Sequence, residues 1–278
     1  MRLQALLPFV THPDPVSDAV VEHAVAVARL VQAEIHTLAI NVDIPPVSSA
    51  LSRLLLDVPE MIRAAEALSR ERADYLLART AQSGLEQGIT VTTESVSAPL
   101  AILRDTAAIR ARYFDLTMIG LEADNPSARA TAEAMIFGSG RPSILLPDIC
   151  RVGTFDHVAI AWDGSRVAAR AVGDALAFLE RARRISVLTV FDDKPLEDDK
   201  AGGRLADGLR QRGLQAEAVS LHARDCPIAE TLQQGALEKG ASLLVMGGYG
   251  HSRVRDFVLG GATQGVLGKP LMPVLISH

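Results

Sequence analysis

The sequence predicts an α/β protein with two doubly wound parallel five-stranded sheets, one in each half of the chain. Three observations support this fold class. Short apolar runs alternate with helical patterns, the order of elements occurs twice, and 278 residues exceed one ordinary domain of roughly 100–150 residues. Hydrophobic residues make up 48% of the sequence and charged residues 22%, which is typical of folded cores and not of disorder.

The first half contains five short segments that we expect to form strands, each with a counterpart in the second half. One helical pattern covers residues 18–33, and a longer one runs from about residue 51 to 83, where Pro59 should interrupt it. A further helix should span residues 99–112. The expected strands are residues 3–10, 34–42, 90–96, 115–120 and 142–147.

The second half repeats this order with clearer signals. Ser165 is a suitable N-cap for a helix after the first apolar run, and Pro227 should open a helix that Gly240 ends. The expected strands are residues 157–162, 184–191, 215–222, 242–248 and 272–277. Strands that alternate with helices indicate βαβ crossovers, and therefore a parallel sheet in each half.

We expect two domains, at residues 1–149 and 154–278, joined by a short linker rich in proline, glycine and polar residues. The repeat aligns Gly120 with Gly247. After Gly120 the first half has no glycine before Gly138, so it resembles a degenerate copy that lacks the glycine-rich loop of the second half. Both halves end in an apolar strand that needs cover, so the two sheets should pair edge to edge as an intramolecular pseudo-dimer.

Charge and composition exclude several classes of function. The formal net charge is −5 and no basic stripe is interleaved with aromatic residues, which argues against a nucleic-acid partner. No apolar run reaches the ~18 residues of a membrane span, and the N-terminal stretch lacks the pattern of a signal peptide. Cys150 and Cys226 lie far apart, which fits a reducing compartment. We therefore expect a cytoplasmic protein without nucleic-acid or membrane partners.

Five glycines crowd the end of the fourth strand of the second half, at positions 247, 248, 250, 260 and 261. If Gly260 and Gly261 open the next helix, their N–H groups and the helix dipole suit an anion such as phosphate. Asp163 ends the first strand, where the ribose of a nucleotide or a metal could lie. The alternative is a β-to-α connection that uses glycine only for tight turns.

Familiar catalytic and phosphate motifs are absent from this stretch. No Gly-Lys-Ser/Thr follows, as a Walker A loop requires, and the first strand of the second half is followed by WDGSRVAA instead of G-x-G-x-x-G. His251, Ser252 and Asp256 do not form a hydrolase signature, because the sequence has no G-x-S-x-G. The sequence therefore does not predict a dehydrogenase, a P-loop enzyme or a serine hydrolase.

The glycine spacing resembles the nucleotide-binding signature of the universal stress proteins. Gly247-x-x-Gly250 is followed after nine residues by Gly260, between an apolar strand and PVLI, and Asp163 also looks like the aspartate of that family. The resemblance covers the second half from end to end. The first half matches in element order and in its closing RPSILLP, so the protein is similar to a tandem form with two Rossmann-like, adenine-nucleotide α-hydrolase-like sheets.

This resemblance implies a stress-response protein that binds ATP, alone or with Mg²⁺, and acts as a regulatory or protective factor. Adenine and ribose would contact Ala161, Trp162, Asp163 and Val190. The ribose and phosphate side would be lined by Met246, Gly247, Tyr249 and Gly250, and the phosphates would be held by Gly260, Gly261, Ala262 and Thr263. The family usually has Ser or Thr where this sequence has Gly261, and the missing hydroxyl is worth roughly 0.5–1.5 kcal/mol. Thr263 could supply a hydroxyl instead.

Three function classes remain open from the sequence. The first is a nucleotide-binding regulatory protein without robust catalysis, the second an enzyme with at most slow ATP hydrolysis, and the third a ligand-free interaction scaffold. The metal, the protein partner and any homodimer are not fixed by the residues.

Overall fold

The protein was analysed as a computed structural model that describes residues 2–14, 16–46, 57–149, 152–192, 200–223, 225–249 and 261–278. Two of the predicted site residues, Gly250 and Gly260, lie outside the described residues, and so do Cys150, His251, Ser252 and Asp256.

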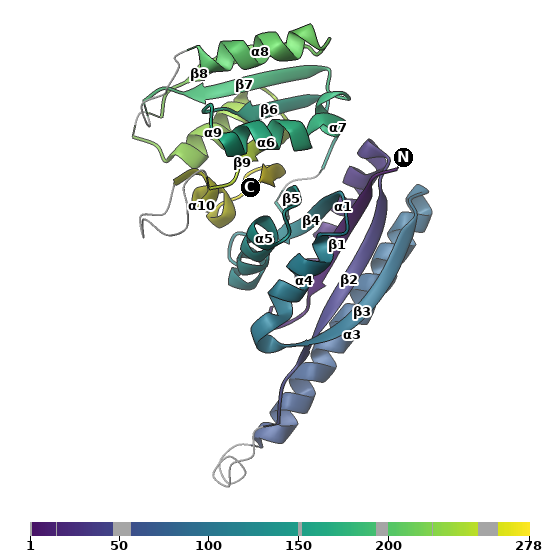
Figure 1. The fold of residues 1–278 in the computed structure, drawn as a ribbon. Coiled ribbons are helices and arrows are strands. Elements are labelled where there is room, and N and C mark those ends of the chain that lie inside the picture. The colour runs from purple at the N-terminus through teal and green to yellow at the C-terminus, as the bar shows by residue number, and fades with distance from the viewer. Residues whose placement is uncertain are drawn as a thin grey trace.

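Ten strands form one continuous sheet, in the order β3-β2-β1-β4-β5-β10-β9-β6-β7-β8 (Figure 1). Each half contributes five neighbouring strands that pair in parallel, which confirms the predicted fold class. The strands of the first half are β1 (Gln4–Val10), β2 (Glu34–Asp43), β3 (Val91–Pro99), β4 (Leu116–Leu121) and β5 (Ser143–Pro147). Those of the second half are β6 (His157–Ala161), β7 (Arg184–Val190), β8 (Ala216–Leu221), β9 (Leu243–Gly247) and β10 (Val274–Ser277).

Helices cover both faces of the sheet. The first half has α1 (Ala19–Val31), α3 (Val58–Gln87), the 3₁₀ turn η1 (Leu100–Ile102), α4 (Leu103–Ala111) and α5 (Pro126–Gly138). The second half has α6 (Arg166–Asp174), α7 (Leu176–Leu179), α8 (Ala201–Gln211), α9 (Ile228–Glu238) and α10 (Gly261–Gly268). Within the described ranges, none of the helices combines the length and the apolar character of a membrane span.

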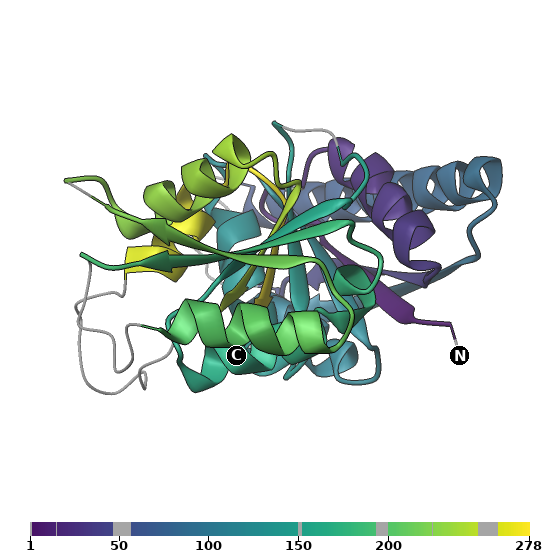
Figure 2. The ribbon, with the colours of Figure 1, turned by 90° about the horizontal axis from the view of Figure 1, so that it is seen from above.

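The strand order decides which helix covers which face. In the second half the polypeptide moves outward from β6 through β7 to β8, and then crosses back to β9 and β10. Right-handed crossovers in opposite directions place their helices on opposite faces. Gly202 of α8 accordingly approaches Thr189, whereas Gly235 of α9 approaches Leu221, the partner of Val190 on the other face. The ribbon seen from above shows α8 and α9 on opposite sides of the sheet (Figure 2).

The two halves join through their last strands, as the sequence predicts. β5 and β10 pair antiparallel, with Leu145 opposite Val274 and Ser143 opposite Ile276. Both strands are buried along their whole length, so this pairing covers two apolar edges at once. Because the strands are antiparallel, the amino edge of the first half lies beside the carboxyl edge of the second half.

Three elements differ from the sequence-based expectation. Pro59 does not interrupt α3, because it lies in the first turn, where a missing N–H costs nothing, and Asp57 caps that turn by accepting from the Glu60 N–H at 3.1 Å. The helix expected after β6 divides into α6 and α7 at Ala175. The residue-99–112 helix begins later, because β3 continues to Pro99.

Candidate functional site

The carboxyl ends of β6 and β9 form the candidate site. These strands are neighbours, but β6 leads to α6 on one face of the sheet and β9 leads toward α10 on the other. Strand order therefore reverses between them, and ligands of open α/β sheets bind in the crevice outside such a point. The residues that leave this edge are Trp162, Asp163 and Gly164 after β6, and Gly248 and Tyr249 after β9.

Asp163 shapes the turn between β6 and α6. Its Oδ1 accepts from the Ser165 N–H at 3.0 Å, across Gly164 with φ +78°. Ser165 then caps α6 by accepting from the Ala168 N–H at 3.3 Å, which confirms the predicted N-cap. The carboxylate that sequence reasoning assigned to ribose or metal thus also has a local structural role, while its side chain stays partly exposed at the edge.

Trp162 presents an unsatisfied donor near this crevice. Its backbone N–H donates to the Leu188 carbonyl at 2.9 Å, which extends the pairing of β6 with β7 by one residue. Its indole Nε1 is buried and has no hydrogen-bond partner among the residues that the structure describes. A buried indole N–H ordinarily finds an acceptor, so this donor marks a place where a ligand acceptor would be stabilised.

Val190 directs its backbone toward the same crevice. The carbonyl of Leu188 faces β6, and in a strand the residue two positions further faces the same side. Phe191 correspondingly donates its N–H to Leu221 of β8, at 3.2 Å. The pairing of β6 with β7 ends at Ala161, opposite Leu188. The N–H and C=O of Val190 therefore face the side of β7 on which β6 lies, but beyond the last paired residue of β6.

Gly247 has a packing role that the sequence did not reveal. A Cβ at this position would lie 2.6 Å from the backbone nitrogen of Ala168 and 2.6 Å from the backbone carbonyl carbon of Val167, so only glycine allows β9 to approach α6 this closely. Gly120, its counterpart in the first half, lies similarly against Val20 of α1, at 3.0 Å. The first half lacks the glycine loop but still has a glycine at the end of its fourth strand. The glycine at this position therefore indicates close strand–helix packing and not ligand binding. Met246 before it is buried.

Tyr249 leaves β9 with φ +45°, an uncommon conformation for a residue other than glycine. Its N–H donates to Thr263 Oγ1 at 3.2 Å, and its ring lies 4.7 Å from the ring of Phe137 in α5. The Tyr249 ring thus lies against the first half, and the Thr263 hydroxyl accepts a hydrogen bond from the Tyr249 backbone.

Gly261, Ala262 and Thr263 form the first turn of α10, a helix that the sequence predicted to open at this place. Gly261 is exposed, Ala262 is partly buried and Thr263 is 4% exposed. A Cβ at Gly261 would lie 3.0 Å from Ile228 Cγ2, and one at Gly265 would lie 2.4 Å from Ala229 Cβ. The glycines of α10 therefore bring it close to α9.

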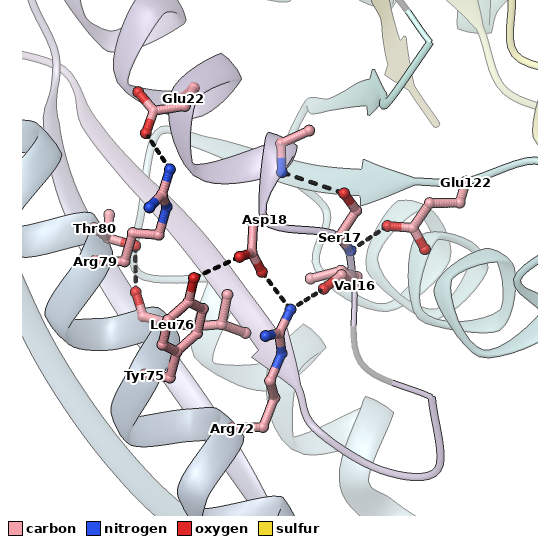
Figure 3. Close-up of polar contacts among 11 residues, drawn as sticks. Val16, Ser17, Asp18, Glu22, Arg72, Tyr75, Leu76, Arg79, Thr80 and Glu122 are labelled. Atoms are coloured by element: carbon pink, nitrogen blue, oxygen red, sulfur yellow. Dashed lines mark hydrogen bonds and ion pairs between the residues drawn. The ribbon is translucent and has the colours of Figure 1, made fainter.

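The corresponding edge of the first half is closed by a carboxylate of the protein itself. Glu122, which follows β4, accepts from the Ser17 N–H at 2.5 Å (Figure 3). It also accepts from Asn125 Nδ2 at 2.7 Å. The hollow between β1, β4 and α5, lined by Gly120 among others, has a volume of only about 10 Å³. Glu122 thus accepts hydrogen bonds from these two donors at the edge that corresponds to the crevice of the second half.

A larger hollow, of about 360 Å³, lies between α8 and the ends of β7 and β8. Thr189, Phe191 and Ser220 line it, together with residues of α8, but none of the predicted site residues does. We place the candidate site at the crevice and not in this larger hollow, because strand order reverses there and because Trp162, with its unsatisfied indole N–H, and Val190, with its outward-facing backbone, lie at this edge. No group of three His, Cys, Asp or Glu side chains among the described residues is arranged to hold a metal.

Comparisons with known proteins agree with this fold. A family model described as the universal stress protein family matches residues 154–278. No curated protein matches the sequence. A universal stress protein from Archaeoglobus fulgidus matches with a TM-score of 0.74 and 18% identity, over 99% of this chain and 96% of that chain.

Two structures from Pseudomonas aeruginosa also match nearly the whole protein. A putative universal stress protein has a TM-score of 0.59 and 16% identity, over 99% of this chain and 93% of its own. A functionally unknown protein has a TM-score of 0.54 and 16% identity, over 99% and 92%. At these identities the likeness concerns the fold, and it extends through both halves.

Proposed function

From the match of residues 154–278 to the universal stress protein family, we propose that the second half of the protein binds an adenine nucleotide at the carboxyl edge of β6, β7 and β9. The proposed role is regulatory or protective in a stress response, with at most slow hydrolysis. ATP is the proposed nucleotide.

The backbone of Val190 is the observation that carries this proposal. Its N–H and C=O face the crevice side by side, one donor and one acceptor. The Watson–Crick edge of adenine has the complementary pair, since N1 accepts and the N6 amino group donates. Guanine has the reverse pattern at this edge, since its N1–H donates and its O6 accepts. The Val190 N–H would then face a donor and the Val190 C=O an acceptor. The geometry therefore favours adenine.

The remaining groups suit the rest of a nucleotide. The buried indole N–H of Trp162 and the carboxylate of Asp163 lie at the end of β6, where ribose would follow adenine. The exposed start of α10 at Gly261 offers backbone N–H groups and the positive end of a helix dipole to phosphate. If Mg²⁺ accompanies ATP, Asp163 is the carboxylate in reach of this edge.

Nucleotide analogues test the proposal without altering the protein. We expect ATP to bind, and both 1-deaza-ATP, which lacks the N1 acceptor, and N6,N6-dimethyl-ATP, which lacks the N6 donor, to bind about tenfold or more weakly, because each leaves one Val190 group unpaired. GTP should not compete. Trp162 is the only tryptophan of the sequence, so its fluorescence reports each titration.

Equal affinity for ATP and both analogues would show that Val190 does not recognise adenine. Equal affinity for ATP and GTP would contradict the preference for adenine. Absence of nucleotide binding at millimolar ATP, together with no nucleotide released from the purified protein, would instead support a ligand-free interaction scaffold.

A further inference from the structure

The junction between the halves brings the end of α5 to the proposed nucleotide edge. β5 follows α5, and its first residue, Ser143, pairs with Ile276 of β10. On its other side β10 pairs with β9, with Ser277 opposite Gly247, and the Gly248 N–H donates to the Ser277 carbonyl at 2.7 Å. The end of an N-terminal helix thus lies one strand away from the carboxyl end of β9.

Aromatic contacts connect the two halves at this place. The ring of Phe137 packs on the ring of Tyr249, with centroids 4.7 Å apart and a 57° tilt, and meets the ring of His278 edge-on at 5.1 Å. His278 Nδ1 lies 2.9 Å from the Gly248 carbonyl oxygen. Phe137 therefore contacts Tyr249, and it also contacts His278, whose side chain is hydrogen-bonded to the Gly248 carbonyl.

Tyr249 transmits this contact to α10. Its left-handed backbone is one that residues other than glycine rarely adopt, so surrounding contacts must hold it. The Phe137 ring is one such contact, and the hydrogen bond from the Tyr249 N–H to the buried Thr263 hydroxyl, at 3.2 Å, is another. Thr263 belongs to the first turn of α10, where the phosphates of the proposed nucleotide would bind.

We infer that Phe137, a residue of the first half, is a positioning residue for the ligand site of the second half. It holds Tyr249, and through Tyr249 and Thr263 it fixes the spacing between the end of β9 and the start of α10. The first half is then a structural part of the nucleotide site and not a passive copy. This inference rests on the proposed nucleotide function.

Phe137→Ala in the protein with both halves present tests the inference, with Phe137→Tyr as the conservative variant. Phe114→Ala is the matched control, because Phe114 also belongs to the first half and stacks on a ring, that of His36 at 5.2 Å, away from β9. We expect Phe137→Ala to weaken ATP binding between about twofold and tenfold, Phe137→Tyr to restore it, and Phe114→Ala to leave it unchanged.

Hydrogen exchange separates this inference from the nucleotide proposal. In the absence of nucleotide, the Tyr249 amide should exchange faster in Phe137→Ala than in the parent, and at the parental rate in Phe137→Tyr and Phe114→Ala. An unchanged Tyr249 rate in Phe137→Ala would overturn the inference whether or not ATP binds. Faster exchange in Phe137→Ala, when the parent protein binds no ATP, would retain the positional role and reject the nucleotide function.

Discussion

At the scale of single residues, glycine serves two purposes in the second half. Gly247 is glycine because the backbone of α6 lies where a Cβ would be, and Gly120 repeats this purpose in a half without a glycine loop. Gly261 is exposed at the start of α10, where its backbone can meet a ligand. Each purpose predicts a different mutational result.

Gly247→Ala should lower the free energy of unfolding by about 1–3 kcal/mol, because the new Cβ meets backbone atoms that cannot rotate away. Gly120→Ala should cost less, since its neighbour at 3.0 Å is the side chain of Val20. Urea unfolding of both variants measures the difference. An unchanged stability in Gly247→Ala would show that the strand–helix distance is not fixed as described.

Gly261→Ser should strengthen ATP binding by roughly two- to tenfold, because it adds a hydroxyl at a helix start. The new Cβ lies 3.0 Å from Cγ2 of Ile228, which has to move by a few tenths of an ångström. Gly268→Ser is the control, because it adds the same hydroxyl at the other end of α10, where the nearest atom is 3.6 Å away. Calorimetric titration compares the two, and an equal affinity would argue against phosphate at Gly261.

At the scale of elements, polar contacts fasten α1 to the long helix α3 (Figure 3). Asp18, at the start of α1, accepts from the Tyr75 hydroxyl at 2.6 Å and pairs with Arg72, and Arg79 pairs with Glu22 at 3.2 Å. Burial disfavours the charged form of Asp18, but the hydrogen bonds from Tyr75 and Arg72 outweigh it and hold the pKa below the ordinary 3.8.

This lowered pKa predicts an acid-dependent contact. A carboxyl group whose pKa is lower in the folded state stabilises the fold above its unfolded pKa, and the contribution disappears as pH falls through the folded pKa. Tyr75→Phe should therefore be less stable than the parent at neutral pH, and this difference should shrink below about pH 4. Tyr113→Phe, at a residue 80% exposed, is the control for urea unfolding at each pH. A difference that grows on acidification would contradict the assignment.

Element order was predictable from local patterns, and element boundaries were not. The Ser165 cap follows from a short-range preference for helix starts, and the structure confirms it. Pro59 misled the prediction because its effect depends on where the helix begins, and Asp57 sets that point. The apolar character of both last strands predicted their pairing, because an apolar edge needs a partner.

At the scale of the whole molecule, the two halves have the same topology but differ at their carboxyl edges. Glu122 fills the edge of the first half with a carboxylate that the protein itself supplies, whereas the second half has the outward-facing backbone of Val190 and the unsatisfied indole N–H of Trp162 at this edge. Sequence patterns could not show that Glu122 accepts a hydrogen bond from the Ser17 N–H. Phe137 was also missed, since its contact with Tyr249 exists only after the halves have joined.

Closure of the first half predicts one nucleotide per protein molecule. Calorimetric titration with ATP should give a stoichiometry of about one, because Glu122 satisfies the Ser17 donor and leaves little volume beside β4. Glu122→Gln should keep this stoichiometry, since the amide oxygen still accepts from Ser17. A value near two in the parent protein would show that the first half also binds nucleotide.

A crystal structure of the protein grown with ATP would show directly where the nucleotide binds. We expect one nucleotide, with the N1 and N6 edge of adenine against the backbone of Val190 and the phosphates at the start of α10. Nucleotide density against residues 119–138, or an adenine that does not contact Val190 at a saturating ATP concentration, would contradict it.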